Sequence, residues 1–308
     1  MPRSNQRTLK KSAECVGIGL HSGRPVSMRL NPAPAGHGIV FARLDQGGRR
    51  VYARAVNVVR TSFATTLSEN GCSISTTEHL MSALYALEID NVLVELDGAE
   101  VPILDGSAAP FIYLIHEAGI FELGAARPRL VLEKPLSVSE QGGRITASPA
   151  PSFSVDYSIN FDHPLVGSQN FRGSISCKSY LSEIATARTF CFLRDVEALR
   201  RQGLALGGCL ENAIVVGDDG ILNDSLRFED EFVRHKVLDL IGDLALLGML
   251  FVGHVRAERA GHRLHTRLVQ EILARPDAWR FEGSTEVAAH HIPSRPAMVA
   301  GGSQTASL

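Results

Sequence analysis

Cysteine is scarce in this sequence and irregularly placed. The 308 residues include five cysteines, at positions 15, 72, 177, 191 and 209, and no two of them form a C-x-x-C pair. This spacing argues against a disulfide framework and against a cysteine-based zinc site, and it suits a reducing compartment.

Long hydrophobic runs are lacking as well. The longest run, Leu244–Gly253, is about half of the roughly 20 residues that a helix needs to cross a bilayer. No apolar segment follows the basic N-terminus, so the sequence predicts no signal peptide. We therefore expect a cytoplasmic protein without a transmembrane segment, for which transient association with a membrane surface stays open.

An excess of charge of one sign is also missing. The formal net charge of -2 provides no broad basic surface, so we expect no nucleic acid as a partner. The GxSxG, P-loop and HExxH signatures are absent, and GIGLHSG near the N-terminus does not have the spacing of a dinucleotide fingerprint. What remains is an ordinary folded composition, with 44% hydrophobic and 21% charged residues.

One pattern of strands and helices occurs twice along the chain. Alternating apolar residues predict strands in the first third, followed by a helix that starts near Ser75 and an apolar strand at residues 91–98. After a linker at residues 124–135 the alternation returns, followed by a long helical region at residues 179–203 and a second helix–strand unit. The sequence thus predicts an α+β fold, and the repeat hints at two halves of similar architecture. The expected ranges are 1–125 and 126–282, with a loosely ordered tail at 283–308.

Three polar residues recur every four positions in FEDEFVRHKVLDLIGDL, which spans residues 228–244. In a helix, His235, Asp239 and Asp243 lie on one face, and such a face is most often solvated. The same sector, however, contains three apolar residues, Phe232, Leu246 and Leu250. Aspartate is also a mediocre helix former, and buried carboxylates need a cation or hydrogen-bond donors. We therefore interpret His235 and Asp239 as two ligands of a metal bound by nitrogen and oxygen.

The helix that starts near Ser75 offers a third ligand. His79 stands near its start, as His235 does in the second half, and a catalytic zinc usually has three protein ligands. The preceding Glu78 has two interpretations. It is the third residue of a capping box with Ser75, or it is the base that takes a proton from the attacking water.

A leaving group that needs a proton requires a further histidine. The segment RAGHRLHT contains His262 and His265, on an expected loop after a strand. Asp243, one helical turn beyond Asp239, is placed to keep such an imidazole protonated and oriented. The residues alone leave the choice between the two histidines open.

Together these segments resemble the LpxC-type family of UDP-3-O-acyl-N-acetylglucosamine deacetylases. The similarity runs from QRTLK near the N-terminus to about Trp279 and includes ISTTEHLMSAL, EVPILDGSAAPF, ARTFCFLRD, LGGCLENAIVV and LRFEDEFVRHKVLDLIGDL. The resemblance implies zinc-dependent hydrolysis of the N-acetyl group of UDP-3-O-acyl-GlcNAc, which releases acetate and commits Gram-negative bacteria to lipid A synthesis. It also implies two domains of similar topology, each a β-sheet packed against helices, with the active site in the cleft between them.

The resemblance implies a role for each matching residue. The implied zinc ligands are His79, His235 and Asp239. The implied catalytic residues are Glu78 as base, His262 as acid, Asp243 behind His262, and Thr189 beside the oxyanion. The implied substrate contacts are Lys236 and Phe190, Phe161 and Arg259 at the nucleotide, and Val196, Ala205 and Gly208 along an acyl-chain passage in the second domain.

Two other functions are compatible with the residues. One is a metal-dependent deacylase of another N-acyl amino sugar, and the other is a module that binds a sugar nucleotide without catalysis. A mixed nitrogen and oxygen ligand set accepts Fe²⁺ as well as Zn²⁺. We expect a monomer that acts on a small-molecule substrate.

Overall fold

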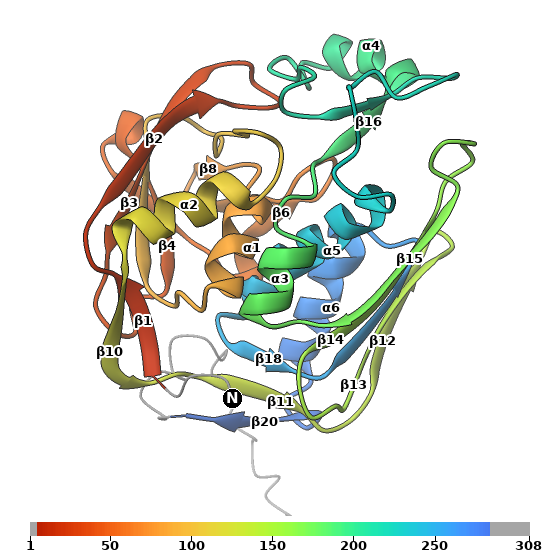
Figure 1. Ribbon diagram of the computed structural model, residues 1–308. Coiled ribbons are helices and arrows are strands. Elements are labelled where there is room, and N and C mark those ends of the chain that lie inside the picture. Colours follow the sequence, from red (N-terminus) through yellow and green to blue (C-terminus); the bar gives the residue numbers. More distant parts are fainter. Residues whose placement is uncertain (1–4, 284–308) are drawn as a thin grey trace, which may run out of the picture.

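Two five-stranded sheets enclose a layer of helices in the computed structural model, which describes residues 5–283 (Figure 1). The tail expected from residue 283 onward lies, apart from Gly283, outside the described residues. The mixture of helices and strands confirms the α+β fold class. Within residues 5–283, no helix is long and apolar enough to cross a membrane.

The first sheet covers one side of the helical layer. Its spatial order is β2 (Ala13–Ile18), β3 (Pro25–Pro32), β9 (Val92–Leu96), β4 (Ile39–Arg43) and β5 (Arg49–Tyr52). Strands β4 and β9 run parallel, and the other neighbours are antiparallel. In β3, Val26, Met28 and Leu30 are buried while the residues between them are not, which is the alternation of a sheet with one covered face.

The second sheet repeats this topology strand for strand. Its order is β12 (Leu136–Glu140), β13 (Gly143–Ser148), β19 (His254–Glu258), β14 (Ser154–Asn160) and β15 (Ser168–Ser174). Strands β14 and β19 run parallel, and the other neighbours are antiparallel. The similar architecture expected for the two halves is therefore confirmed.

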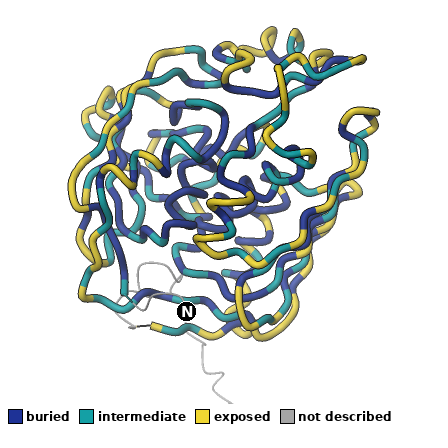
Figure 2. The backbone as a smooth tube through the Cα atoms, viewed as in Figure 1, coloured by how far each residue is buried: buried dark blue, intermediate teal, exposed yellow. Residues whose placement is uncertain are grey.

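Helices α1 (Glu78–Ala86) and α5 (Glu231–Leu244) form the centre of the molecule, where they pack against each other. Helix α6 (His262–Ala274) lies against α5 and the second sheet. Every residue of α1 is buried, and Figure 2 shows the same for most of this central layer. A helix that is enclosed on all sides belongs to the core, so polar side chains on its faces are held away from bulk water.

The remaining strands form small sheets around these layers. One sheet pairs β1 (Asn5–Leu9) with β10 (Ile120–Ala126), and another pairs β11 (Arg129–Leu132) with β18 (Leu250–Val252) and β20 (Trp279–Glu282). A third consists of β6 (Val58–Arg60), β7 (Thr66–Glu69) and β8 (Cys72–Ile74). The expected linker at residues 124–135 thus contains the end of β10 and the whole of β11. Helix α2 (Ala109–Ala118) packs against α1 and β2.

The long helix expected at residues 179–203 is wrong. This stretch contains most of α3 (Cys177–Glu183), then strand β16 (Phe190–Phe192), then α4 (Leu193–Arg201). Strand β16 pairs in parallel with β17 (Ile214–Val216), so its conformation depends on a partner that local periodicity does not reveal. The α4 region projects at one end of the molecule (Figure 1).

Two local expectations are also wrong. Helix α1 begins at Glu78, and Thr76 has a φ of 58°, a left-handed conformation that prevents the helix from extending back to Ser75. The Glu78 carboxylate accepts the backbone N–H of Thr65 at 3.0 Å, so no capping box with Ser75 forms. His262 is the first residue of α6, and His265 lies within that helix rather than on a loop.

Candidate metal centre and active site

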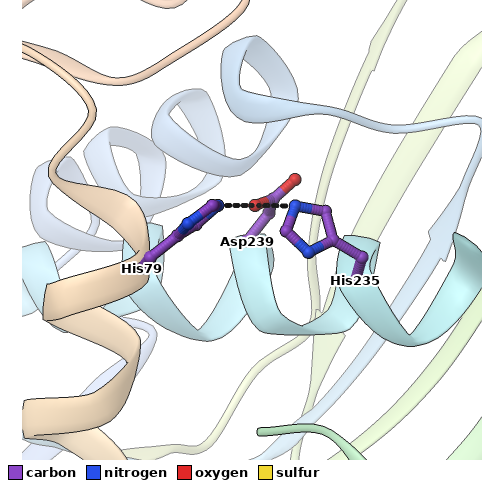
Figure 3. A group of neighbouring side chains, drawn as sticks. All are labelled: His79, His235 and Asp239. Atoms are coloured by element: carbon purple, nitrogen blue, oxygen red, sulfur yellow. Dashed lines mark ion pairs between the residues drawn. The ribbon is translucent and has the colours of Figure 1, made fainter. Parts of the chain in front are cut away.

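His79 of α1 and His235 and Asp239 of α5 meet at the contact between the two helices (Figure 3). The Nε2 atoms of His79 and His235 lie 3.7 Å and 3.4 Å from Oδ1 of Asp239. Two ligands of a tetrahedral ion, each bonded at about 2.1 Å, stand about 3.4 Å apart. The three buried side chains therefore have the spacing of ligands around one ion.

The hydrogen bonds of these residues test whether a metal fits. Nδ1 of His235 lies 3.0 Å from the carbonyl oxygen of Ala187, so this nitrogen carries the proton and Nε2 presents a lone pair. That lone pair faces Oδ1 of Asp239, a buried oxygen that no donor among the described residues reaches. An acceptor facing an unpaired carboxylate oxygen is unfavourable unless a cation lies between them. The site therefore fits a metal ion.

The protonation states are also those of metal ligands. Burial and the neighbouring His235 lower the pKa of His79 to about 3, and burial lowers the pKa of His235. Burial opposes ionisation of Asp239, but Lys236 and His235 hold the pKa of its carboxyl below the usual range. Two neutral imidazoles and one carboxylate are the forms that coordinate a divalent ion.

A second set of polar groups stands beside the ligands. Oε1 of Glu78 lies 3.7 Å from Nε2 of His262, whose Nδ1 lies 2.8 Å from Oδ2 of Asp243. Thr65 joins the two carboxylates, because its N–H donates to Glu78 at 3.0 Å and its hydroxyl donates to Asp243 at 2.6 Å. Thr65 was not predicted from the sequence, because it lies 178 residues from Asp243 in the chain and belongs to no recognisable motif.

The surroundings of Glu78 and His262, which face each other, raise the pKa of both side chains. Burial raises the pKa of Glu78 to about 7. Burial alone would lower the pKa of His262, but the carboxylates of Asp243, Asp239 and Glu78 overcome it and raise that pKa to about 9. A carboxylate that can accept a proton therefore stands opposite an imidazolium that can donate one, which is the pairing that general acid–base catalysis needs.

The metal-ligand group opens into a cleft of about 310 Å³. Thr189, Phe190 and Lys236 line this cleft together with Glu78 and His262. The Nζ of Lys236 lies 5.6 Å from the centre of the Phe190 ring and 2.7 Å from Oδ2 of Asp239. These residues surround the space next to the ligands, where a substrate must enter.

An apolar passage adjoins the cleft and shares Leu20, Phe63, Thr189 and Phe190 with it. Its volume is about 330 Å³. The residues expected along an acyl chain, Val196, Ala205 and Gly208, all line it. Aliphatic side chains from α4 and β17 supply much of the rest, which suits a hydrocarbon chain.

The two residues expected at a nucleotide lie farther out. Phe161 packs against the cleft residue Phe190, with ring centres 5.7 Å apart, and is not itself among the described residues that line the cleft or the passage. Arg259 has a φ of 48° and follows β19, and it is not one of the described residues that line the cleft or the passage. The structure thus brings the expected ligand, base and acid residues together and leaves Arg259 apart from them.

Three side chains spaced to hold one ion, with a carboxylate facing an imidazole beside a cleft, are the features of a metal-dependent hydrolase. A sequence model of the family described as LpxC, UDP-3-O-acyl N-acetylglycosamine deacetylase, matches residues 6–274. The chain therefore belongs to the LpxC family.

Similar proteins named UDP-3-O-acyl-N-acetylglucosamine deacetylase occur in several bacteria. The one from Myxococcus xanthus is 50% identical over 279 residues, which are 90% of this chain and 89% of that protein. The one from Acidithiobacillus ferrooxidans is 50% identical over 280 residues, or 90% of this chain and 92% of that protein. The one from Citrifermentans bemidjiense is 48% identical over 276 residues, or 89% and 90%.

Proposed function

We propose that this protein hydrolyses the N-acetyl group of UDP-3-O-acyl-N-acetylglucosamine to give UDP-3-O-acyl-glucosamine and acetate, the committed step of lipid A synthesis. One observation carries the proposal. His79, His235 and Asp239 line a cleft that adjoins an apolar passage. A substrate with one amide, a polar nucleotide and a long acyl chain needs such a combination. Family membership and the names of the similar proteins support it.

The metal is proposed to be Zn²⁺, with Fe²⁺ as the other ion that this ligand set accepts. Held by His79, His235 and Asp239, such an ion supplies Lewis-acid chemistry, because it polarises a carbonyl and makes water more acidic. The unpaired Oδ1 of Asp239 and the two neutral imidazoles support this assignment.

The side chains of the cleft carry the remaining steps. The carboxylate of Glu78 takes a proton from the water that attacks the acetamide carbon. The hydroxyl of Thr189 donates a hydrogen bond to the oxyanion, and one such donor typically contributes about 3–4 kcal/mol. Nε2 of His262 gives its proton to the amine nitrogen as the C–N bond breaks, while Asp243 holds Nδ1 on the other side of the ring.

Other contacts are proposed from the same placement. Lys236 and Phe190 contact the substrate at the cleft, and Val196, Ala205 and Gly208 contact its acyl chain. Phe161 and Arg259 are proposed at the nucleotide.

We also propose two domains at residues 1–125 and 126–282, because each range contains one of the two five-stranded sheets. We further propose that the protein is a cytoplasmic monomer that associates transiently with the membrane surface. Within the described residues, Cys15, Cys72, Cys191 and Cys209 are free thiols, which suits a reducing compartment.

The test is acetate release from UDP-3-O-acyl-GlcNAc by the purified protein, before and after chelation and after addition of Zn²⁺ or Fe²⁺. We expect release that the chelator abolishes and that metal restores. Substrates that lack the UDP or the 3-O-acyl group form the control panel. Equal turnover of the truncated substrates would indicate a deacylase of another amino sugar. Binding without acetate release by the folded, metal-loaded protein would indicate a non-catalytic module.

A further inference from the structure

A buried chain of hydrogen bonds continues behind His262. Nδ1 of His265 lies 2.9 Å from Oδ2 of Asp243, the same oxygen that His262 contacts at 2.8 Å. Both imidazoles belong to α6 and lie one helical turn apart. The hydroxyl of Thr65 occupies the other oxygen of Asp243. Three donors from two segments of the chain therefore fix both oxygens of this carboxylate.

The chain ends at Tyr157 of β14. Its hydroxyl lies 2.9 Å from Nε2 of His265 and donates to the carbonyl oxygen of Ala260 at 2.8 Å. Ala260 stands two residues before His262, at the turn into α6. Tyr157 therefore contacts both the imidazole behind Asp243 and the backbone from which His262 projects.

His265 is too enclosed to act on a substrate itself. Its side chain is 0% exposed, both of its ring nitrogens are engaged, and it is not among the described residues that line the cleft. The burial of His265 supports His262 as the acid. His262 faces the cleft and Glu78, whereas His265 faces the protein interior.

We infer that His265 and Tyr157 are positioning residues that hold Asp243 and the start of α6, so that Nε2 of His262 points at the leaving amine. This inference rests on the proposed function. An imidazole held by one hydrogen bond can still rotate and shift, and a displacement of about 1 Å at a reacting group can cost about 10²-fold in rate. His265 holds the carboxylate of Asp243 in place, and Tyr157 holds the backbone at Ala260. Together they limit the rotation and the displacement of the His262 imidazole.

The first variants test the donor to Asp243. His265→Leu removes the donor and the contact with Tyr157. His265→Asn keeps a donor, because Nδ2 of asparagine is separated from Cβ by the same number of bonds as Nδ1 of histidine. We expect kcat to fall about 100-fold in His265→Leu and about 10-fold in His265→Asn, the two ends of the range found for outer hydrogen-bond partners. KM and metal content should stay near those of the wild type.

Tyr157→Phe removes the hydroxyl that contacts Nε2 of His265. We expect its kcat to match that of His265→Asn, because both variants lose the hydrogen bond between residues 157 and 265. Tyr85→Phe is the matched control. Tyr85 is also buried, and its hydroxyl accepts one backbone N–H, that of Phe251, at 3.0 Å. We expect this control to lower the melting temperature and to leave kcat unchanged.

Several outcomes would overturn the inference. One is a kcat in Tyr157→Phe and His265→Asn equal to that of the Tyr85→Phe control. Another is an equal loss in the Asn and Leu variants, and a third is a rise in KM at constant kcat. If His265→Leu does not fold, the kcat values of His265→Asn and Tyr157→Phe still test the inference. A wild-type protein that releases no acetate would instead refute the proposed function, so the two failures are distinguishable.

Discussion

Replacement of Gly242 by alanine should impair catalysis more than it impairs folding. Gly242 lies on α5 where that helix crosses the start of α1. A Cβ added there would stand 2.8 Å from the carbonyl carbon of Glu78 and 3.0 Å from its Cα, and it would also clash with the carbonyl oxygen. All of these atoms belong to the backbone, so no side chain can rotate to make room. The two helices must separate.

The size of the effect follows from this geometry. Ordinary contacts between carbon atoms need about 3.5–4 Å, and the carbonyl oxygen of Glu78 lies closer than either carbon, so the crossing must open by about 1 Å. Overpacking of this kind costs about 1–3 kcal/mol, and replacing a helical glycine by alanine returns up to about 1 kcal/mol. The net loss of about 0–3 kcal/mol leaves the protein folded, because native proteins are stable by about 5–15 kcal/mol. The same displacement moves Glu78 and His79 relative to Asp239 and Asp243, so we expect kcat to fall about 10- to 100-fold.

Acetate release, bound metal and melting temperature together test this prediction. Gly124→Ala is the matched control, because a Cβ at Gly124 meets no atom of the described residues within 4 Å. We expect the control to behave like the wild type. A Gly242→Ala variant with wild-type kcat would refute the reasoning, since it would show that the spacing of the two helices does not set the geometry of the site.

Four further predictions concern single features. Glu78→Gln should lower kcat by about 10²- to 10⁴-fold with bound metal unchanged, because it removes the base and none of the ligands; an unchanged kcat would remove that role. Chelation should lower the melting temperature by about 10 °C, since a ligand at 1,000 times its Kd stabilises by about 4 kcal/mol, and scanning calorimetry with zinc added back would show whether it does. Ala213→Phe, which fills the apolar passage, should raise KM for a long-chain substrate and spare a short-chain one. Glu231→Leu should lower the free energy of unfolding by about 3–5 kcal/mol in a urea titration, because it leaves the buried Arg188 without its carboxylate.

The two proposed metal ligands on α5 could be predicted from the local sequence. His235 and Asp239 are four residues apart in one helix, so their proximity follows from helix geometry once the helix is recognised. Hydrogen bonds between residues on different helices and strands could not be predicted in this way. Thr65 reaches Asp243 across 178 residues, and Tyr157 reaches His265 across 108. No periodicity marks such pairs, because each depends on how whole sheets and helices pack.

The same reasoning explains the error at residues 179–203. The apolar residues of β16 were compatible with a helix, and only pairing with β17 makes the strand favourable. That pairing places Phe190 and its neighbours along the cleft and the passage. The segment that sequence patterns describe worst is therefore one that shapes the substrate site, where local preference gives way to long-range contacts.

The repeated topology accounts for the position of the metal centre. In each half, a central helix, α1 or α5, precedes the middle strand of its sheet, β9 or β19. These equivalent helices pack on each other, and the contact is close because Gly242 has no side chain to keep the backbones apart. Side chains on the shared face are thereby removed from water, which keeps both imidazoles neutral and leaves Oδ1 of Asp239 dependent on a cation. In the proposed mechanism, the first half contributes one ligand and the base, and the second contributes two ligands and the acid. The group of His79, His235 and Asp239 draws on both halves, so the joining of the two repeats creates it.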